Sequence, residues 1–298
     1  MNKCSVIILN FNRHKYLKNN ILPYLCKYKN IDQIIISHGK KSTYFDSSKI
    51  SSKILDLKDW DKNQEYGLTL RFLASEYSSN YNIIIMDDDI LPTEETVNIL
   101  IKNIQKKENI YGLYGRMLDK KFKYRTELYF GQCHIVLTRC LITTKEMCKY
   151  FMDNYKKYEY QMVKESKPFW NGEDILFNLL SIKKTNQFPV AINLSHINKN
   201  IITENLFSTV SISSSTDHLK YRKILTQKLV EDMDLKDKIK ENNNKNRKQN
   251  WIYEIINSDL IFYLFLLILL ILIILYLRKN KYKIIKNAYR HFTKRNND

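Results

Sequence analysis

The first 195 residues alternate short apolar runs with amphipathic segments. Short apolar runs predict strands, and apolar residues that recur every three or four positions predict helices. We expect strands at 5–9, 33–37, 53–57, 82–86, 110–114 and 188–194. We expect helices at 14–28 and 64–78, from Glu94 onward, and at 144–156 and 174–182. This alternation indicates an α/β fold, with a mainly parallel sheet flanked by helices.

The segment 122–138 breaks the alternation. Its two apolar stretches, 122–130 and 133–138, predict an antiparallel pair of strands. Beyond residue 198 the hydrophobic periodicity fades into Ser-, Asn- and Lys-rich sequence, which is typical of a solvated linker. We therefore place a catalytic domain at 1–200 and a polar linker or stalk, partly helical, at 201–259.

One long apolar run lies near the C-terminus. Leu260–Leu277 contains no charged residue, and a stretch of this length predicts a transmembrane helix. A basic tail, 278–298, follows it. Because no apolar signal segment opens the chain, we expect a single-pass protein anchored near its C-terminus, with the catalytic domain in the cytosol. The basic tail argues for the opposite orientation.

Composition narrows the function classes. The formal net charge is +18, but outside the tail the basic residues are spread along the chain and form no recognisable nucleic-acid module, so we expect no nucleic-acid partner. The five cysteines are odd in number and include no Cys-x-x-Cys pair. This pattern favours free thiols over a disulfide framework or a structural zinc site.

The strongest chemical signal is the acidic triplet Asp87-Asp88-Asp89, directly after the apolar run 82–86. Three adjacent carboxylates repel one another, and a hard divalent cation with its preference for oxygen ligands relieves that repulsion. Such a cation can bridge carboxylates to a substrate diphosphate and stabilise the diphosphate as a leaving group. The alternative is a solvated acidic turn before a helix.

Two further motifs flank predicted elements. Asn12 and Arg13 follow the first strand, where a planar guanidinium suits a phosphate. The sequence Trp170-Asn-Gly-Glu173-Asp174 precedes a helix, and its two acids and its aromatic ring suit a sugar pocket. Acidic residues also favour helix N-termini for purely structural reasons, and Arg13 can be a surface residue.

The ordered set SVIILNFNR, IIIMDDDILP, YGLYGR, CHIVLTRCLITTKEMCKYF, WNGEDILFNLL and FPVAI resembles the C-terminal domain of the exostosin family of glycosyltransferases, family 64. The resemblance covers residues 4–195. It implies a GT-A fold, a requirement for Mn²⁺ or another divalent cation, and a UDP-sugar donor. It also implies transfer of an N-acetylhexosamine or a hexuronic acid with retention, to a glycan, glycoprotein or glycolipid acceptor. The predicted anchor would place this chemistry at a membrane.

The resemblance also implies roles for residues that lie at the family's motif positions. Asp89 corresponds to the metal ligand, with Asp87 beside it. Asp87 and Asp88 lie near the ribose and phosphates, and Arg13 approaches the nucleotide. Arg71 corresponds to the Arg of an Asn-Arg-Phe motif, in which Leu70 replaces the Asn that touches the base, so base recognition departs from the family pattern.

The later motifs carry further implied roles. Asp174 corresponds to the acid beside the transferred sugar, and Glu173 is its partner. We add Arg116 and Trp170 to the residues that bind the nucleotide sugar. His196 follows the last strand and is a metal-ligand candidate by analogy with other GT-A enzymes. Gly172 replaces a Cys that is disulfide-bonded in secreted relatives, and Arg222 is the candidate for the family's C-terminal catalytic Arg.

Two other functions fit the same residues. An inverting family 2 glycosyltransferase has similar first-strand and acidic motifs, and Asp174 would then be a general base. A membrane-tethered binding protein without catalysis would share the fold alone. The intact acidic motifs favour an enzyme, and the anomer of the product distinguishes the two enzymes.

Overall fold

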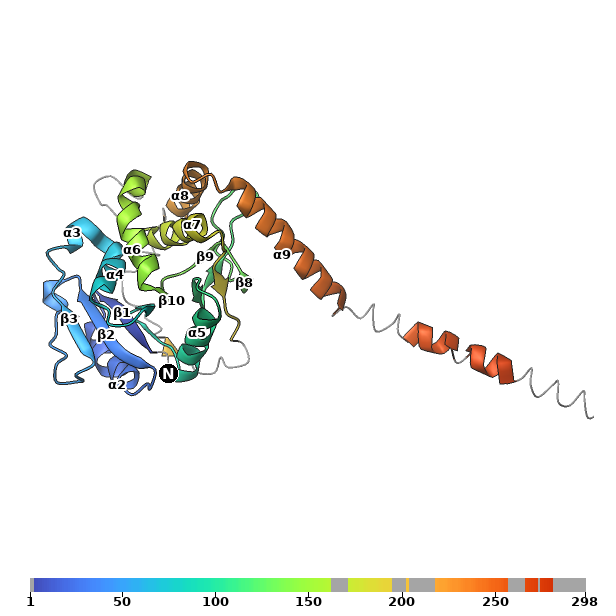
Figure 1. The fold of residues 1–298 in the computed structure, drawn as a ribbon, viewed down its shortest axis with the longest axis horizontal. Coiled ribbons are helices and arrows are strands. Elements are labelled where there is room, and N and C mark those ends of the chain that lie inside the picture. Colours follow the sequence, from blue (N-terminus) through green and yellow to red (C-terminus); the bar gives the residue numbers. More distant parts are fainter. Residues whose placement is uncertain are drawn as a thin grey trace, which may run out of the picture. The chain divides into compact units, whose positions relative to one another are not determined.

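The computed structural model describes residues 3–161, 171–194, 202–203, 218–256, 266–272 and 274–280, and these form an α/β arrangement (Figure 1). The long strands of the sheet are β1 (Cys4–Asn10), β2 (Ile31–His38), β3 (Ile54–Leu57), β4 (Asn82–Asp87) and β10 (Cys140–Thr144). The short strands are β5 (Ile90–Leu91), β6 (Tyr111–Gly112), β7 (Gly115–Arg116), β8 (Gly131–Gln132), β9 (Ile135–Val136), β11 (Val190–Ala191) and β12 (Ile202–Thr203).

The helices fall into short turns near the N-terminus and longer helices after residue 93. The short ones are α1 (His14–Tyr16), α2 (Leu22–Leu25), α3 (Asn63–Tyr66) and α4 (Leu70–Leu73), and a π-helical segment, Leu17–Ile21, joins α1 to α2. The longer ones are α5 (Glu94–Lys106), α6 (Lys145–Asn154), α7 (Glu173–Thr185), α8 (His218–Asp232) and α9 (Lys236–Ile256). Thr93 and Thr144 cap α5 and α6 by accepting backbone N–H bonds, the usual role of Thr at a helix N-terminus.

The main sheet is mixed, with the strand order β3-β2-β1-β4-β10-β6-β11-β8. The first four strands are parallel to one another. β10 then runs antiparallel to both β4 and β6, and β8 runs antiparallel to β11. The predicted α/β class is therefore present, with antiparallel pairs added to a mostly parallel sheet. The four parallel strands place their carboxyl ends along one edge.

Side chains of the central strands alternate between two cores, one on each face of the sheet. Ile7 and Ile85 belong to the core that also contains Phe72, Phe151 and Phe177 from α4, α6 and α7. The neighbouring residues Val6, Ile8 and Ile84 belong to the opposite core, which is covered by α2 and α5. Because the strands are buried on both faces, they appear in the sequence as continuous apolar runs.

The cysteines serve as packing residues. All five are free, and all but Cys26 are buried. Burial raises the pKa of the Cys133, Cys140 and Cys148 thiols to about 12. These thiols are therefore inert at neutral pH and pack as small apolar groups.

The predicted antiparallel pair of 122–130 with 133–138 is wrong. β8 pairs with β11 and β9 pairs with β7, and Tyr129 instead forms a bridge to Gly115. Apolar periodicity marks residues that can form strands, but their partners are set by the whole sheet. The predicted helix 64–78 is likewise divided, at Gly67, whose φ is 49°.

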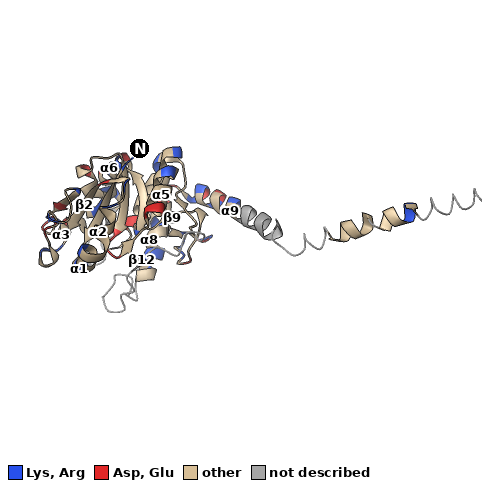
Figure 2. Ribbon diagram, turned by 90° about the horizontal axis from the view of Figure 1, so that it is seen from below, with Lys and Arg blue, Asp and Glu red and all other residues tan. Residues whose placement is uncertain are grey.

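The chain divides into two compact units, residues 1–240 and 241–298. α8 lies in the range predicted as linker, and its Leu225, Leu229 and Val230 are buried in the core of the first unit. Lys and Arg side chains are spread over many elements of the chain and do not gather on one helix (Figure 2).

The predicted transmembrane helix is wrong. Among the residues that the structure describes, no helix is long and apolar enough to cross a membrane. The residues described in this region are 266–272 and 274–280. The predicted single-pass localisation, with a C-terminal anchor, is corrected by the same finding. The rest of the predicted span, 260–265 and 273, lies outside the described residues, as does the tail from 281.

A single glycine allows α8 to approach the start of α7. Gly172 is the N-cap residue of α7 and has a left-handed φ of 98°. A Cβ at this position would overlap Cδ2 of Leu225 on α8. The absence of a side chain therefore permits both the backbone conformation and the contact between the two helices. Arg222 lies one helical turn before Leu225, so the same contact sets how closely Arg222 approaches α7.

We expect Gly172→Ala to lower the free energy of unfolding more than the matched variant Gly131→Ala. Gly131 also has a left-handed φ of 91°, but nothing lies within 4 Å of a Cβ there. Gly131→Ala thus meets only backbone strain, about 1–2 kcal/mol. Gly172→Ala meets that strain and must also displace Leu225, which costs roughly 1–3 kcal/mol more. Urea unfolding measures both values, and equal losses would contradict the proposed role of the contact.

Candidate functional site

Two neighbouring parallel strands bring the first-strand motif and the acidic triplet to one edge of the sheet. β1 pairs with β4, and Leu9 lies opposite Asp87. The segments that follow these strands, 10–13 and 87–89, therefore meet at the carboxyl edge. Open α/β sheets form their ligand crevices at this edge.

Arg13 holds the middle of the acidic triplet. Its Nη1 donates to Asp88 Oδ1 at 3.0 Å, and its Nη2 lies 3.5 Å from Asp89 Oδ2. The Asp88 side chain is buried, and this burial raises its pKa to about 6 despite the nearby guanidinium. Asp88 therefore anchors the turn, while its neighbours in the triplet remain more accessible.

Arg71 links the triplet to a second acidic group. It is a buried residue of α4 whose Nη1 donates to Asp87 Oδ1 at 3.1 Å. Burial alone would lower the pKa of Arg71, but Asp87, Glu173 and Asp174 outweigh that effect and raise it. The guanidinium thus interacts electrostatically with carboxylates from two separate elements, the end of β4 and the start of α7. The neighbouring Leu70, which replaces the family's Asn, is fully buried in the core.

One carboxylate oxygen of Asp89 has no hydrogen-bond partner among the described residues. Its Oδ1 is buried and accepts no hydrogen bond from any described residue. Burial raises the pKa of Asp89, and the neighbouring charge of Asp87 raises it further. A divalent cation would satisfy this oxygen, so Asp89 fits the predicted metal ligand. Within the described ranges no group of three or more His, Cys, Asp or Glu residues is arranged to hold a metal.

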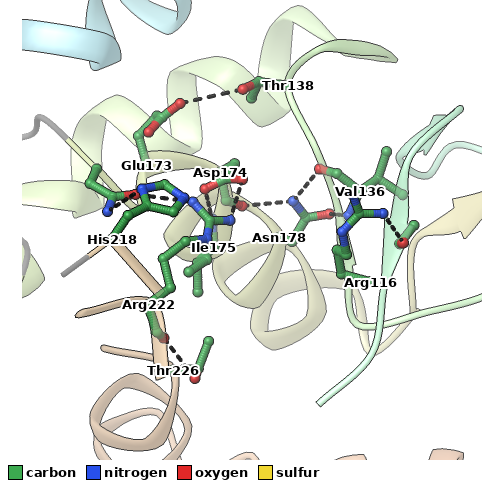
Figure 3. A network of polar contacts seen from close by, with 12 residues as sticks. Arg116, Val136, Thr138, Glu173, Asp174, Ile175, Asn178, His218, Arg222 and Thr226 are labelled. Atoms are coloured by element: carbon green, nitrogen blue, oxygen red, sulfur yellow. Dashed lines mark hydrogen bonds and ion pairs between the residues drawn. The ribbon is translucent and has the colours of Figure 1, made fainter. Parts of the chain in front are cut away.

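The second acidic group lies at the N-terminus of α7 (Figure 3). Asp174 accepts a hydrogen bond from Arg222 Nη2 at 2.7 Å, and both side chains are buried. Its other oxygen accepts the Ile175 N–H at 2.9 Å. Glu173 accepts the Thr138 hydroxyl at 3.3 Å. The Arg222 guanidinium also lies over the ring of Tyr124, 4.3 Å from its centroid.

Glu173 and Asp174 differ in how nearby arginines compensate their negative charge. Burial raises the pKa of Glu173 to about 7, and the charge of Asp174 raises it further, against the opposing effects of Arg71 and Arg222. Arg222 is paired directly with Asp174, and the carboxylates around it raise its pKa despite burial. Glu173 is therefore able to exchange a proton near neutral pH, while Asp174 is held in an ion pair.

Asn178 fixes the start of α7 against the sheet. Its Oδ1 accepts the Val136 N–H at 3.0 Å and its Nδ2 donates to the Val136 carbonyl at 2.9 Å. The same amide donates to the Asp174 carbonyl at 2.7 Å. In Figure 3 Asn178 lies between Asp174 and Val136. A fully buried amide with all three bonds satisfied gives the acidic turn a fixed position.

Two predicted residues, Asn12 and Arg116, make none of the contacts described above. Asn12 is exposed, and its Oδ1 accepts from Lys40 at 3.5 Å. Arg116 donates to the carbonyl of Gly115 at 2.8 Å, and it forms no ion pair with the site carboxylates among the described residues. Trp170 and His196 lie outside the described residues.

The sequence analysis missed some residues of the site and gave others only a weak signal. Thr138 and Asn178 act only through contacts made in the fold, although both lie in motifs that carry the family resemblance. Arg139 was not considered. Its carbonyl accepts the Asp87 N–H at 3.1 Å, and its guanidinium lies 4.8 Å from the centroid of the Tyr114 ring. In the part of the chain that is described, it forms no ion pair.

We expect the free energy of unfolding of Glu173→Gln, relative to that of the wild-type protein, to increase as pH rises. The pKa of Glu173 is about 7 in the folded protein and near its ordinary value of 4.5 when unfolded. Between these values the folded state binds more protons, so Glu173 lowers stability progressively from about pH 4.5 to pH 7. Gln cannot ionise and avoids this loss. Urea unfolding of the wild-type protein and the variant at pH 5 and pH 8 measures the effect, and a difference that does not change with pH would contradict the raised pKa.

Comparison with known protein families identifies the family of the chain. The sequence profile of the glycosyl transferase family 64 domain matches residues 4–247, which include β1, the acidic triplet, α7 and α8. A comparison with curated proteins finds no match. Because the family profile covers most of the chain, the chain belongs to glycosyl transferase family 64 and is a glycosyltransferase, which binds a sugar donor and an acceptor.

Proposed function

We propose that this glycosyltransferase uses a divalent cation such as Mn²⁺ and transfers a sugar, an N-acetylhexosamine in the closest analogy, from a UDP-sugar to an acceptor hydroxyl. One observation carries the proposal. Buried Arg71 donates a hydrogen bond to Asp87 and is acted on by the charges of Glu173 and Asp174, which supports one site shared by the acidic triplet and the acids of α7. A diphosphate at the first group would place its sugar toward the second.

The triplet serves the diphosphate end of the donor. Asp89, through its unpartnered Oδ1, and Asp87 would hold the cation, which supplies positive charge to a departing diphosphate. Arg13 is committed to Asp88 and Asp89 and keeps these side chains in place. Arg139 has no carboxylate partner among the described residues, so its guanidinium is free to bind a phosphate oxygen.

The α7 acids serve the sugar end. During transfer, the bond from the anomeric carbon to the diphosphate oxygen breaks and a bond to the acceptor oxygen forms, while the acceptor hydroxyl loses its proton. Asp174 is held by Arg222 at 2.7 Å, which suits electrostatic stabilisation of a positively charged sugar. Glu173, with its pKa of about 7, is better suited to moving a proton.

We favour retention, because a carboxylate fixed in an ion pair is better placed to stabilise charge than to accept a proton. The alternative is inversion by a family 2-like mechanism with a carboxylate as general base. A panel of UDP- and GDP-sugars with Mn²⁺ tests the function, and NMR of the product identifies its anomer. No hydrolysis or transfer with any donor would instead support a binding protein without catalysis.

We expect Asp89→Asn to remove most of the cation-dependent turnover while the protein stays folded. The substitution keeps the size of the side chain but removes the charge that would bind the cation. Asp61→Asn is the control, because Asp61 is exposed and distant in sequence from the site elements. Turnover is measured with Mn²⁺ and with excess EDTA. Full activity in EDTA, or near-normal turnover of Asp89→Asn, would contradict the metal role.

We expect Asp174→Asn to slow transfer far more than it weakens UDP binding. Asp174 is placed at the sugar end, and removal of a positioned acid or base reduces rates about 10²–10⁴-fold. The kcat and the Kd for UDP, measured on the same preparation, separate the two effects. Equal losses in both would mean that Asp174 shapes the nucleotide site or the fold.

A further inference from the structure

A hydrogen-bonded chain continues from Asp174 to a histidine at the start of α8. Arg222 donates through Nη2 to Asp174 at 2.7 Å and through Nη1 to Asn171 Oδ1 at 3.1 Å. The Asn171 amide nitrogen lies 3.1 Å from His218 Nδ1. His218 and Arg222 are four residues apart on α8, so they lie on the same helical face. These hydrogen bonds therefore connect the titratable His218 to the Arg222–Asp174 pair, which we place at the transferred sugar.

The hydrogen-bond donors around Asn171 determine which ring nitrogen of His218 carries the proton. A guanidinium has no acceptor, so Asn171 must present its oxygen to Arg222. The amide nitrogen of Asn171 then faces His218 and must donate. Nδ1 of His218 is consequently the acceptor and carries no proton. The neutral ring therefore holds its proton on Nε2.

A positively charged His218, with protons on both ring nitrogens, cannot form the same hydrogen bonds. With a proton on Nδ1, two donors would face each other across 3.1 Å. Rotating the Asn171 amide would relieve that conflict but would turn its nitrogen toward Arg222, another donor. Burial lowers the pKa of His218 and the charge of Arg222 lowers it further, while Asp174 acts in the opposite sense. These are the charged groups that face the ring from α7 and α8, and their net effect keeps His218 neutral at physiological pH.

We propose that His218 and Asn171 are positioning residues for the Arg222–Asp174 pair, and that sugar transfer requires the neutral, Nε2-protonated form of His218. The inference rests on the proposed function, since it takes Asp174 to face the transferred sugar. Protonation of His218 breaks the bond between Asn171 and either His218 or Arg222. Arg222 then loses one of its two fixed partners and holds Asp174 less firmly.

Two substitutions at His218 separate positioning from simple packing. His218→Asn keeps an acceptor near the place of Nδ1 but does not titrate. His218→Leu keeps a similar volume but offers no acceptor. Lys220→Asn is the matched control, because Lys220 is exposed on the same turn of α8. Circular dichroism establishes that each variant of the full chain is folded.

The measurement is kcat at saturating donor between pH 5 and pH 8, with the Kd for UDP at each pH. We expect His218→Leu to lose roughly tenfold to a hundredfold in kcat at pH 7.5 through misplacement of the pair, with UDP affinity little changed. We expect His218→Asn to retain most of kcat and to lose activity less steeply on acidification. Glu173 titrates in the same range, so the difference between wild type and His218→Asn is the diagnostic. An acid limb unchanged in His218→Asn, or an unchanged kcat in His218→Leu, would overturn the proposal.

A second readout does not depend on activity. Nitrogen-15 NMR of the imidazole should show Nδ1 without a proton and Nε2 with one at pH 7.5. The opposite tautomer would overturn the inference even in an active enzyme. If no donor is turned over but the NMR result is as expected, the proposed function fails while the hydrogen-bonded chain stands.

Discussion

The site depends on a buried guanidinium that balances carboxylates from two parts of the fold. Arg71 is almost fully buried, and a buried charge is stable only when it is paired and hydrogen-bonded. It has Asp87 as a direct partner and Glu173 and Asp174 as electrostatic neighbours. Without Arg71, the carboxylates after β4 and those opening α7 would repel one another across a poorly solvated interior. Arg71 is therefore the residue whose charge both acidic groups act on.

A second arginine, Arg222 on α8, also compensates the negative charge of the α7 acids. Arg222 reaches Asp174 because α8 packs closely on Gly172 through Leu225. A Cys at position 172, as in secreted relatives of the family, would meet the same obstacle as any other side chain. The family match extends to residue 247 and includes α8.

Much of the fold could be predicted from the sequence, because the central strands are apolar on both faces and the helices that follow have apolar residues at helical spacing. β1, β2, β4, α5 and α7 lie close to their predicted ranges. The pairing of 122–138 could not be predicted, since short strands there take their partners from β11 and β7. The apolar run 260–277 satisfied a length rule for membrane spans, but no helix among the described residues is long and apolar enough to cross a membrane.

The sequence predicted the acidic residues of the site better than it predicted the basic residues. The acidic triplet stands out because it directly follows an apolar strand, whereas the two acids of α7 also suit a helix N-terminus for structural reasons. Arg13 was found from the polar turn after the first strand, Arg71 through the family resemblance, and Arg222 only as a candidate. Asn171, His218 and Asn178 were not assigned roles, because their functions arise from hydrogen bonds between segments far apart in the sequence. No local pattern marks such contacts.

The central claim is that the two acidic groups around Arg71 form one donor site. A crystal structure of the protein with Mn²⁺ and a non-hydrolysable UDP-sugar tests it most directly. The account predicts that the cation contacts Asp89, that the diphosphate lies beside the triplet, and that the sugar ring lies against Asp174. A donor whose sugar points away from α7, or a cation bound by residues other than the triplet, would contradict it.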